Sequence, residues 1–265
     1  MSNLICPVCK NNLTLSGSSY RCESGHCFDI AKEGYVNLLT GSKAGNLIGD
    51  NRDMARSRKS FLDKGYFADL AKALCSVVSD FAPTNVLDIC CGEGYYTQIL
   101  KENTSAEVIG FDISKEMVRL AAKRKCGATF FVANMADIPL ATESIDCAIH
   151  LFAPFCEKEF HRIITHGGYL ISVCPGANHL WELKAALYET PYKNEEISPV
   201  LSGFTLEKAL NTGRKILLQS NEDIDALFKM TPYYYHTSAQ DKAKLNSLNE
   251  LETQTDFYIR IYRKD

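Results

Sequence analysis

Four cysteines and one histidine near the start of the chain have the spacing of a metal site. Cys6 and Cys9 are two residues apart, so their thiolates can face one ion from a tight turn. Cys22 follows after twelve more residues, and His26 and Cys27 stand next to each other shortly after it. Ligands of this kind at this spacing favour tetrahedral zinc. If this stretch is extended, His26 and Cys27 point to opposite faces, so only one of them can be the fourth ligand.

A glycine-containing loop forms the second candidate site. The sequence NVLDICCGEGYYT predicts a buried strand, a turn and the start of a helix. Gly92 and Gly94 would let the backbone approach a ligand closely, and Asp88 precedes them at the carboxyl end of the strand. Asp112 lies 20 residues past Gly92, at the end of the next predicted strand. A carboxylate there accepts hydrogen bonds from the ribose hydroxyls of a nucleoside.

The acidic side chains of this loop favour S-adenosylmethionine over a dinucleotide. Glu93 stands between the two glycines and Asp88 just before them. Two carboxylates repel a pyrophosphate but attract the ammonium and sulfonium groups of S-adenosylmethionine. The third predicted strand ends at Asn134 and Met135, which could bond the adenine amine and pack on its ring.

Short apolar runs that alternate with helical patterns indicate the elements that must position these residues. The predicted strands are Val86–Ile89, Glu107–Ile113, Ala128–Ala133, Ile145–Phe152, Tyr169–Cys174, Arg214–Gln219 and Asp256–Arg263. The predicted helices between the first five strands are Tyr95–Asn103, Lys115–Lys125 and Glu157–Ile164. This alternation is typical of an α/β fold. We therefore expect a Rossmann-like class I methyltransferase domain, with a mostly parallel seven-stranded sheet and helices on both faces.

The composition and the predicted elements change along the chain and divide it into three segments. Residues 1–35 should form a small zinc-binding domain, because so short a segment cannot build a core without the metal. Residues 36–80 are predicted to be a linker and helical connection, with a Gly-rich stretch at Thr40–Asn51 and helix over Arg52–Val78, broken at Gly65. Residues 81–265 should form the methyltransferase domain.

The composition excludes several classes of protein. A hydrophobic fraction of 46% excludes a disordered chain, and no apolar run is long enough for a membrane helix. The eleven cysteines are an odd number without a visible export signal, so we expect reduced thiols in a cytoplasmic protein. The net charge of −3 gives no overall attraction to nucleic acid. Any basic surface must be local, and the cluster Arg52, Arg56, Arg58, Lys59 and Lys64 is the candidate.

Several stretches of the chain together resemble one family. They are CPVC at Cys6–Cys9, YRCESGHCFDIAKEGYVNLL at Tyr20–Leu39, LDICCGEGYYT at Leu87–Thr97, PGANHLWELK at Pro175–Lys184, KMTPY at Lys229–Tyr233 and QTDF at Gln254–Phe257. With these motifs the chain resembles the RlmA family of 23S rRNA guanine-N1 methyltransferases over essentially its whole length. The resemblance implies methylation of N1 of a guanine in a domain II hairpin of 23S rRNA. S-adenosylmethionine would be the cofactor, and the sequence leaves a homodimer open.

The resemblance also implies site residues. It makes His26, with Cys6, Cys9 and Cys22, the fourth zinc ligand. It places cofactor contacts on Gly92, Glu93 and His179, and a further contact, usually a tyrosine, on Phe67.

The loop departs from the usual pattern at Cys90, where a first glycine is usual. Since a cysteine adopts positive φ only at a cost, we expect Cys90 to keep φ negative.

The chemistry of guanine N1 requires loss of a proton, and a general base would help. The sequence singles out none, with His150, Asp146 and His179 as candidates. Aromatic residues that could receive an unstacked base include Phe152, Phe155, Tyr188, Tyr192 and the run Tyr233–Tyr235.

Two other functions stay open at this stage. The chain could methylate a small molecule beneath a lid at Glu189–Thr212, with the zinc module purely structural. It could also be a zinc module with a degenerate domain that only senses the cofactor, although the intact Asp88, Gly92, Gly94 and Asp112 count against this.

Overall fold

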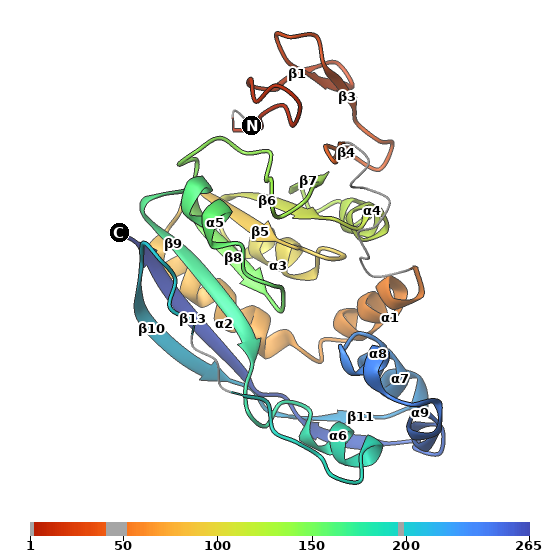
Figure 1. The fold of residues 1–265 in the computed structure, drawn as a ribbon. Coiled ribbons are helices and arrows are strands. Elements are labelled where there is room, and N and C mark those ends of the chain that lie inside the picture. The colour runs from red at the N-terminus through yellow and green to blue at the C-terminus, as the bar shows by residue number, and fades with distance from the viewer. Residues whose placement is uncertain (1–2, 41–51, 196–198) are drawn as a thin grey trace.

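The computed structural model describes residues 3–40, 52–195 and 199–265. The chain begins with a small antiparallel sheet (Figure 1) made of β1 (Thr14–Ser16), β2 (Ser19–Arg21) and β3 (Cys27–Asp29). These three-residue strands are mostly exposed, so they bury little apolar surface of their own. The predicted linker at Thr40–Asn51 lies, apart from its first residue, outside the described residues.

The main sheet has eight strands in the order β10-β13-β9-β8-β5-β6-β7-β4. Their bounds are β4 Tyr35–Asn37, β5 Asn85–Ile89, β6 Glu107–Asp112, β7 Thr129–Val132, β8 Ile145–Leu151, β9 Ile164–Pro175, β10 Phe204–Thr212 and β13 Phe257–Lys264. The six strands from β4 to β9 pair in parallel, whereas β13 pairs antiparallel with both of its neighbours, β9 and β10. The mostly parallel class I methyltransferase sheet is thus confirmed.

The number and membership of the strands differ from the prediction. The segment predicted at Arg214–Gln219 forms β11 (Lys215–Leu218), but it pairs with β12 (Leu251–Gln254) in a separate two-stranded sheet. Its place in the main sheet is taken by β10, a segment that the sequence analysis placed only in the lid of the alternative small-molecule function. β10 is an edge strand whose side chains are mainly exposed, so it lacks the apolar run that marks a buried strand. The eighth strand, β4, lies at the predicted boundary after residue 35 and pairs with β7.

Helices cover both faces of the main sheet. The helices of the described residues are α1 Arg52–Asp63, α2 Ala68–Phe81, α3 Tyr95–Asn103, α4 Lys115–Lys123, α5 Glu157–Ile163, α6 Trp181–Leu187, α7 Asn221–Lys229, α8 Tyr233–His236 and α9 Ala239–Leu245. The last four lie beside the smaller sheet of β11 and β12 (Figure 1). One face of the main sheet packs on α2 and α3 through Val86, Val108 and Cys147. The neighbouring residues Leu87, Ile109 and Ala148 pack on the other face, with α5. This alternation is the two-residue period of a strand buried on both sides.

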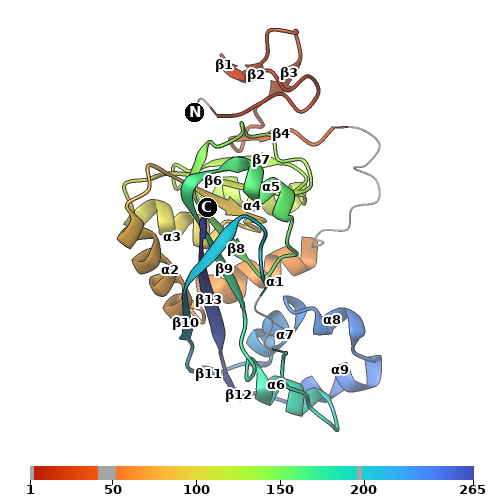
Figure 2. The same cartoon turned by 60° about the vertical axis from the view of Figure 1, so that its left-hand side comes forward.

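The zinc-binding domain lies directly on the methyltransferase domain (Figure 2). Leu4 forms an antiparallel bridge with Leu140, and the Ile5 N–H donates to the Pro139 carbonyl at 3.0 Å. Lys10 forms an ion pair with Asp137 at 2.6 Å. Leu4 also belongs to the same buried cluster as the strands. Apolar residues of the small domain are therefore buried against the large domain, in a core that the two domains share.

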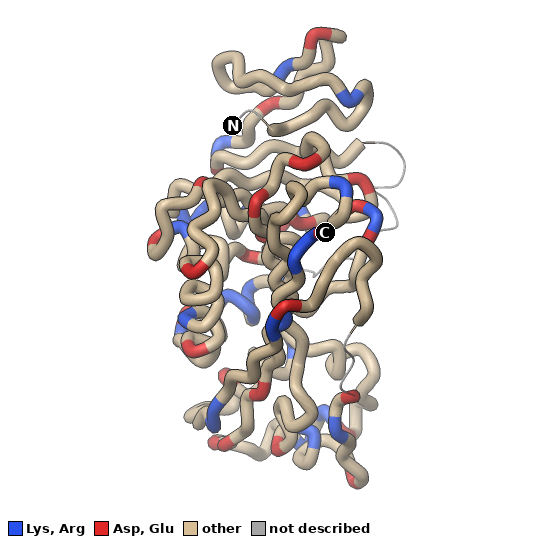
Figure 3. Tube along the Cα trace, turned by 90° about the vertical axis from the view of Figure 1, so that its left-hand side faces the viewer, with Lys and Arg blue, Asp and Glu red and all other residues tan. Residues whose placement is uncertain are grey.

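Charges of both signs are interspersed along the chain (Figure 3). Among the described residues, no helix is both long and apolar enough to cross a membrane.

Candidate metal centre and cofactor crevice

The four donor atoms of Cys6, Cys9, Cys22 and His26 lie within 4.8 Å of one another. The Cys9 and Cys22 sulfurs are 3.6 Å apart, and His26 Nδ1 is 3.3 Å from the Cys22 sulfur. Thiolates bound to one tetrahedral zinc at about 2.3 Å are separated by about 3.8 Å, so the donor set and its geometry fit that ion. Hydrogen bonds from Ser24 and Asn11 lower the pKa of Cys9 to about 6, which favours the thiolate that binds metal.

The neighbouring Cys27 lies outside this cluster. It begins β3, is exposed, and its thiol faces Asp29 with a sulfur–oxygen distance of 4.0 Å. The alternation of side chains along an extended backbone therefore separates His26 from Cys27, as the sequence predicted.

The glycine loop between β5 and α3 makes its turn with three left-handed residues. Cys90, Gly92 and Gly94 have φ values of 57°, 55° and 82°. The expectation of a negative φ at Cys90 is therefore wrong. The Cys91 N–H donates to the Phe111 carbonyl at 2.8 Å, so the chain must turn back toward β6 directly after β5. This tertiary bond outweighs the modest cost of a left-handed residue without β-branching.

The two glycines of the loop serve different purposes. A Cβ at Gly94 would lie 2.8 Å from the Cβ of Ala121, so glycine lets α3 begin against α4. A Cβ at Gly92 would meet nothing closer than the Arg58 side chain at 3.8 Å. Gly92 therefore faces open space, which is where a ligand could approach.

A crevice of about 720 Å³ opens beside the loop, at the carboxyl ends of β5, β6, β8 and β9. Of the nine predicted cofactor residues, it is lined by Phe67, Gly92, Asp112 and His179. These four come from segments far apart in the sequence, and the fold brings them together. Asp88, Glu93, Gly94, Asn134 and Met135 do not line it.

Asp112 is the carboxylate that faces the crevice. One of its oxygens accepts the Gly92 N–H at 3.0 Å and the other accepts the Ser114 N–H at 2.8 Å. A carboxylate at this position is an acceptor of the kind that a pair of ribose hydroxyl groups requires.

Asp88 lies beneath the loop rather than in the crevice. It is 2% exposed, and its carboxylate accepts the Thr97 hydroxyl at 2.5 Å. Burial raises the pKa of Asp88 to about 7, opposed by the Thr97 hydrogen bond and assisted by Asp112. This side chain connects β5 to α3, and because it is buried beneath the loop it does not face a ligand in the crevice.

Glu93 is turned away from the crevice as well. It is 1% exposed and paired with Arg124, whose Nε donates to it at 2.9 Å. Burial raises the pKa of Glu93 while Arg124 opposes that shift. Its charge is therefore compensated within the protein. The electrostatic preference inferred from Asp88 and Glu93 thus depends on Asp112 instead.

Phe67 and His179 line the crevice, and both pack on the buried Phe257, which does not line it. The rings of Phe67 and His179 each lie near that of Phe257, at 5.1 and 4.6 Å between centroids. Desolvation lowers the pKa of His179 to about 3, so it is neutral. Its Nδ1 accepts the Asp256 N–H at 3.2 Å. The remaining nitrogen, Nε2, then carries the proton.

Asn134 and Met135 lie beside the loop. Asn134 accepts the Ala136 N–H through its side-chain oxygen at 2.9 Å, and the Met135 sulfur is 3.9 Å from the Cys90 sulfur.

The three candidate bases occupy different places. Asp146 accepts hydrogen bonds from the backbone and hydroxyl of Thr84, at the amino end of its strand, and lies outside the crevice. His150 lines the crevice and is 1% exposed. Its Nε2 pairs with the Pro154 carbonyl at 2.9 Å, and its Nδ1 has no partner among the described residues. Burial lowers the pKa of His150, so it is a neutral imidazole.

Sequence reasoning missed the part that α1 contributes to the crevice. Met54 and Arg58 line it, and Arg58 Nη2 donates to the Met230 carbonyl at 3.5 Å. The signal was available, because residues four apart share one face of a helix.

The basic cluster on α1 and at the following residue, Lys64, is largely paired with acids. Lys59 and Lys64 form ion pairs with Asp63 and Asp223, both at 2.5 Å. Arg52 lies 3.7 Å from Glu116. This helix therefore offers less free positive charge than its composition indicated.

Known proteins match the chain over both domains. Residues 4–43 match the model of the RlmA N-terminal zinc ribbon, and residues 86–168 match a methyltransferase domain. The chain is 38% identical, over 69% of its length and 67% of the relative's, to the 23S rRNA (guanine(748)-N(1))-methyltransferase of Streptomyces fradiae. A Bacillus subtilis relative, provisionally named for the same activity, is 29% identical over 98% of this chain and 96% of its own length. With its zinc ribbon and its crevice for S-adenosylmethionine, the chain belongs to the RlmA-like family of 23S rRNA (guanine-N1)-methyltransferases.

Proposed function

We propose that this enzyme transfers a methyl group from S-adenosylmethionine to N1 of one guanine in a domain II hairpin of 23S rRNA, in the cytoplasm. The observation that carries this proposal is the lining of the crevice. The crevice combines Gly92 and Asp112 with the exposed aromatic residues Phe152, Phe155 and Tyr235. A nucleoside-bearing donor and a flat acceptor base would therefore meet inside it.

Asp112 and Gly92 would hold the donor. The carboxylate of Asp112, which lines the crevice, suits the two ribose hydroxyls, and the open space before Gly92 suits a chain that passes close to the backbone. When bound, S-adenosylmethionine supplies a methyl carbon that is already activated by its positively charged sulfur. The enzyme then mainly aligns the reactants, which can contribute about 7–11 kcal/mol.

Phe152 is the best-supported platform for the acceptor guanine. It follows β8 directly, has a φ of 54°, and keeps its ring 41% exposed at the crevice. A left-handed phenylalanine is strained, and such strain persists where the surrounding structure enforces it. Here the Phe152 N–H donates to the Val173 carbonyl at 3.1 Å, which holds the residue in place.

His150 is the candidate acceptor for the N1 proton. Of the three candidate bases, His150 and His179 both line the crevice. Only His150 has in addition a ring nitrogen, Nδ1, without a hydrogen-bond partner among the described residues. Its lowered pKa leaves it neutral, as a base must be. Because Nδ1 is buried, the segment at Phe152–Phe155 would have to shift when the base enters.

Primer extension across hairpins of 23S rRNA tests this function. After incubation with enzyme and donor, we expect a stop at one guanine, because a methyl group at N1 blocks base pairing. The stop should disappear without donor and weaken at least tenfold with Phe152→Ala, while Leu206→Ala, an exposed residue of β10, should leave it unchanged. If no stop forms and a small molecule consumes methyl groups instead, the enzyme acts on small molecules.

A further inference from the structure

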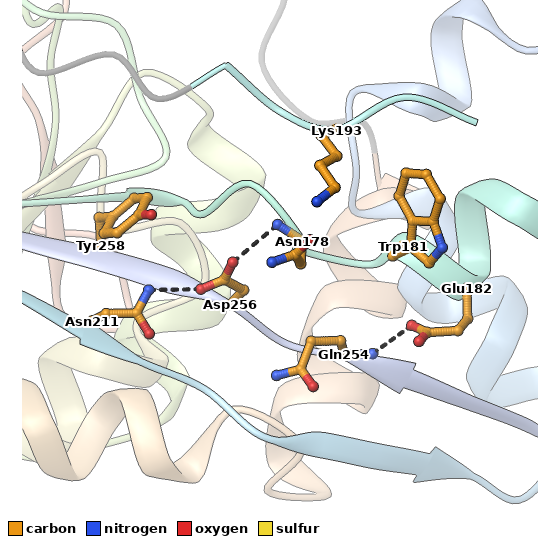
Figure 4. Close-up of a pocket in the computed structure, with 8 residues that line it drawn as sticks. All are labelled: Asn178, Trp181, Glu182, Lys193, Asn211, Gln254, Asp256 and Tyr258. Atoms are coloured by element: carbon orange, nitrogen blue, oxygen red, sulfur yellow. Dashed lines mark hydrogen bonds between the residues drawn. The ribbon is translucent and has the colours of Figure 1, made fainter. Parts of the chain in front are cut away.

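A second cavity, of about 570 Å³, lies next to the crevice. Among the described residues, none lines both cavities. Figure 4 shows the residues that line it, which are Asn178, Trp181, Glu182, Lys193, Asn211, Gln254, Asp256 and Tyr258. None of them was predicted to contact cofactor or metal. The cavity is therefore a separate site to be explained.

The turn between β9 and α6 forms the wall between the two cavities. His179 faces the crevice and its neighbour Asn178 faces the second cavity. Asp256 holds this turn, because its carboxylate accepts the Asn178 N–H at 2.9 Å and its own N–H donates to His179 Nδ1. A Cβ at Gly176 would lie 2.4 Å from the Asp256 carboxyl carbon, so glycine is required for this approach. The turn between β9 and α6 thus separates the two cavities, and Asp256 holds this turn in place for both.

The second cavity keeps unused hydrogen-bonding capacity. Asp256, which is 8% exposed, accepts Asn211 Nδ2 at 2.7 Å, and this leaves the Asn211 side-chain oxygen available. Glu182 accepts the Gln254 N–H at 2.8 Å through one oxygen, and its other oxygen has no hydrogen bond to a described residue. The Lys193 ammonium forms no ion pair with any residue that the structure describes, and Figure 4 shows it directed toward Asn178.

The lining selects a class of ligand. Trp181 and Tyr258 stand at opposite ends, with amides, two carboxylates and one ammonium between them (Figure 4). Two carboxylates against one lysine disfavour a phosphate group. Arg260 already lies over the Tyr258 ring, 5.2 Å from its centroid, so the indole of Trp181 is the aromatic face that suits a flat ring. Mixed donors and acceptors suit the polar edge of such a ring. These are the requirements of a nucleobase.

We propose that this cavity receives an unpaired nucleobase of the substrate RNA, close to the guanine that enters the crevice. The inference rests on the proposed function, because it assumes that the substrate is RNA. Guanine fits the lining best, since its N1–H and N2–H groups can donate to the carboxylate oxygens and Lys193 can donate to its O6. The second base would fix the register of the loop on the enzyme, as extruded bases do in other RNA complexes.

Intrinsic fluorescence tests the proposal on the unmodified protein. Trp181 is the one tryptophan in the chain, so tryptophan emission reports on this cavity alone. Titration with the 23S hairpin that is methylated should quench the emission, because a base would stack on the indole. Guanosine alone should quench it more than uridine. Quenching by simple sugars but not by nucleosides would overturn the proposal in favour of a saccharide site.

Variants separate this inference from the proposed function. Trp181→Ala should raise the KM for the hairpin roughly tenfold, with S-adenosylmethionine affinity changed less than twofold, and Trp181→Phe should restore most of the loss. Leu217→Ala, at an exposed apolar residue of β11 outside both cavities, is the matched control. If the hairpin is methylated but neither Trp181 emission nor the KM of Trp181→Ala changes, the second site is refuted and the function stands. If the hairpin is neither bound nor methylated, the proposed function fails.

Discussion

The zinc ribbon and the cofactor crevice are built from the chain in opposite ways. The four metal ligands lie between Cys6 and His26, on a few turns and short strands. The crevice is lined by residues from Met54 to Tyr235, contributed by helices, strand ends and loops. A site made within one short segment is visible as a spacing of residue types. A site assembled from distant segments becomes visible only when their packing is known.

Removal of a zinc ligand should have the largest effect. Cys22→Ser should abolish stoichiometric zinc and unfold the ribbon, because zinc binding in such small domains contributes about 10–16 kcal/mol. Elemental analysis and limited proteolysis measure this. S-adenosylmethionine affinity should change less than threefold, since no residue of the described segment 3–40 lines the crevice.

Cys27→Ser is the matched control for the metal site. Its side chain is exposed and outside the cluster, so this variant should keep one zinc per chain. Zinc loss from Cys27→Ser together with zinc retention in His26→Ala would contradict the ligand set.

Asp88 should make stability depend on pH. Its folded pKa of about 7 lies above the ordinary value of 3.8, so the folded state keeps a proton that the unfolded chain releases. The stabilising contribution is therefore complete below about pH 4 and is lost as pH rises to about 7. The Asp88→Asn variant has no carboxyl group at this position, so its free energy of unfolding does not fall for this reason as the pH rises.

The stability of Asp88→Asn relative to wild type should thus increase over that pH range, by up to about 4 kcal/mol. Urea unfolding at several pH values measures the difference. Asp137→Asn, at an exposed aspartate, should show no such trend. A flat difference for Asp88→Asn would mean that the carboxylate is ionised in its buried position.

Gly94→Ala tests whether the loop is shaped by packing or by conformation alone. We expect a loss of about 2–4 kcal/mol in the free energy of unfolding, from a positive φ and a Cβ that collides with Ala121. Gly127→Ala is the control, because Gly127 has nearly the same φ of 83° but meets no atom closer than 3.9 Å. It should cost about 1 kcal/mol. Equal losses in the two variants would refute the role of the α3–α4 contact.

Asp112→Asn should have the smallest effect of the four, about a tenfold loss of S-adenosylmethionine affinity, because a charged hydrogen bond contributes about 1.5–3 kcal/mol and the amide replaces part of it. Calorimetry measures the dissociation constant. Asp146→Asn, at the opposite end of the sheet, should bind the cofactor normally. Equal affinities for wild type and Asp112→Asn would show that the ribose is bound elsewhere.

Local spacing along the chain was enough for Cys6, Cys9 and Cys22 as metal ligands, for the parallel strands from β5 to β9 and for the helices between them. These features depend on neighbouring residues, on strand periodicity and on apolar runs that buried strands require. The alternation of an extended backbone indicated that only one of His26 and Cys27 could be the fourth ligand, and the family resemblance, not the spacing, selected His26.

Tertiary packing decided the rest. The sequence does not reveal that Arg124 neutralises Glu93, that Asp88 is buried beneath the loop, or that Cys90 must turn left-handed to let Cys91 bond to Phe111. Nor does it reveal that β10, with its exposed side chains, completes the sheet while the more apolar β11 stays outside. In each case the outcome depends on how segments separated along the chain pack together, and no local pattern of residue types records which segments those are.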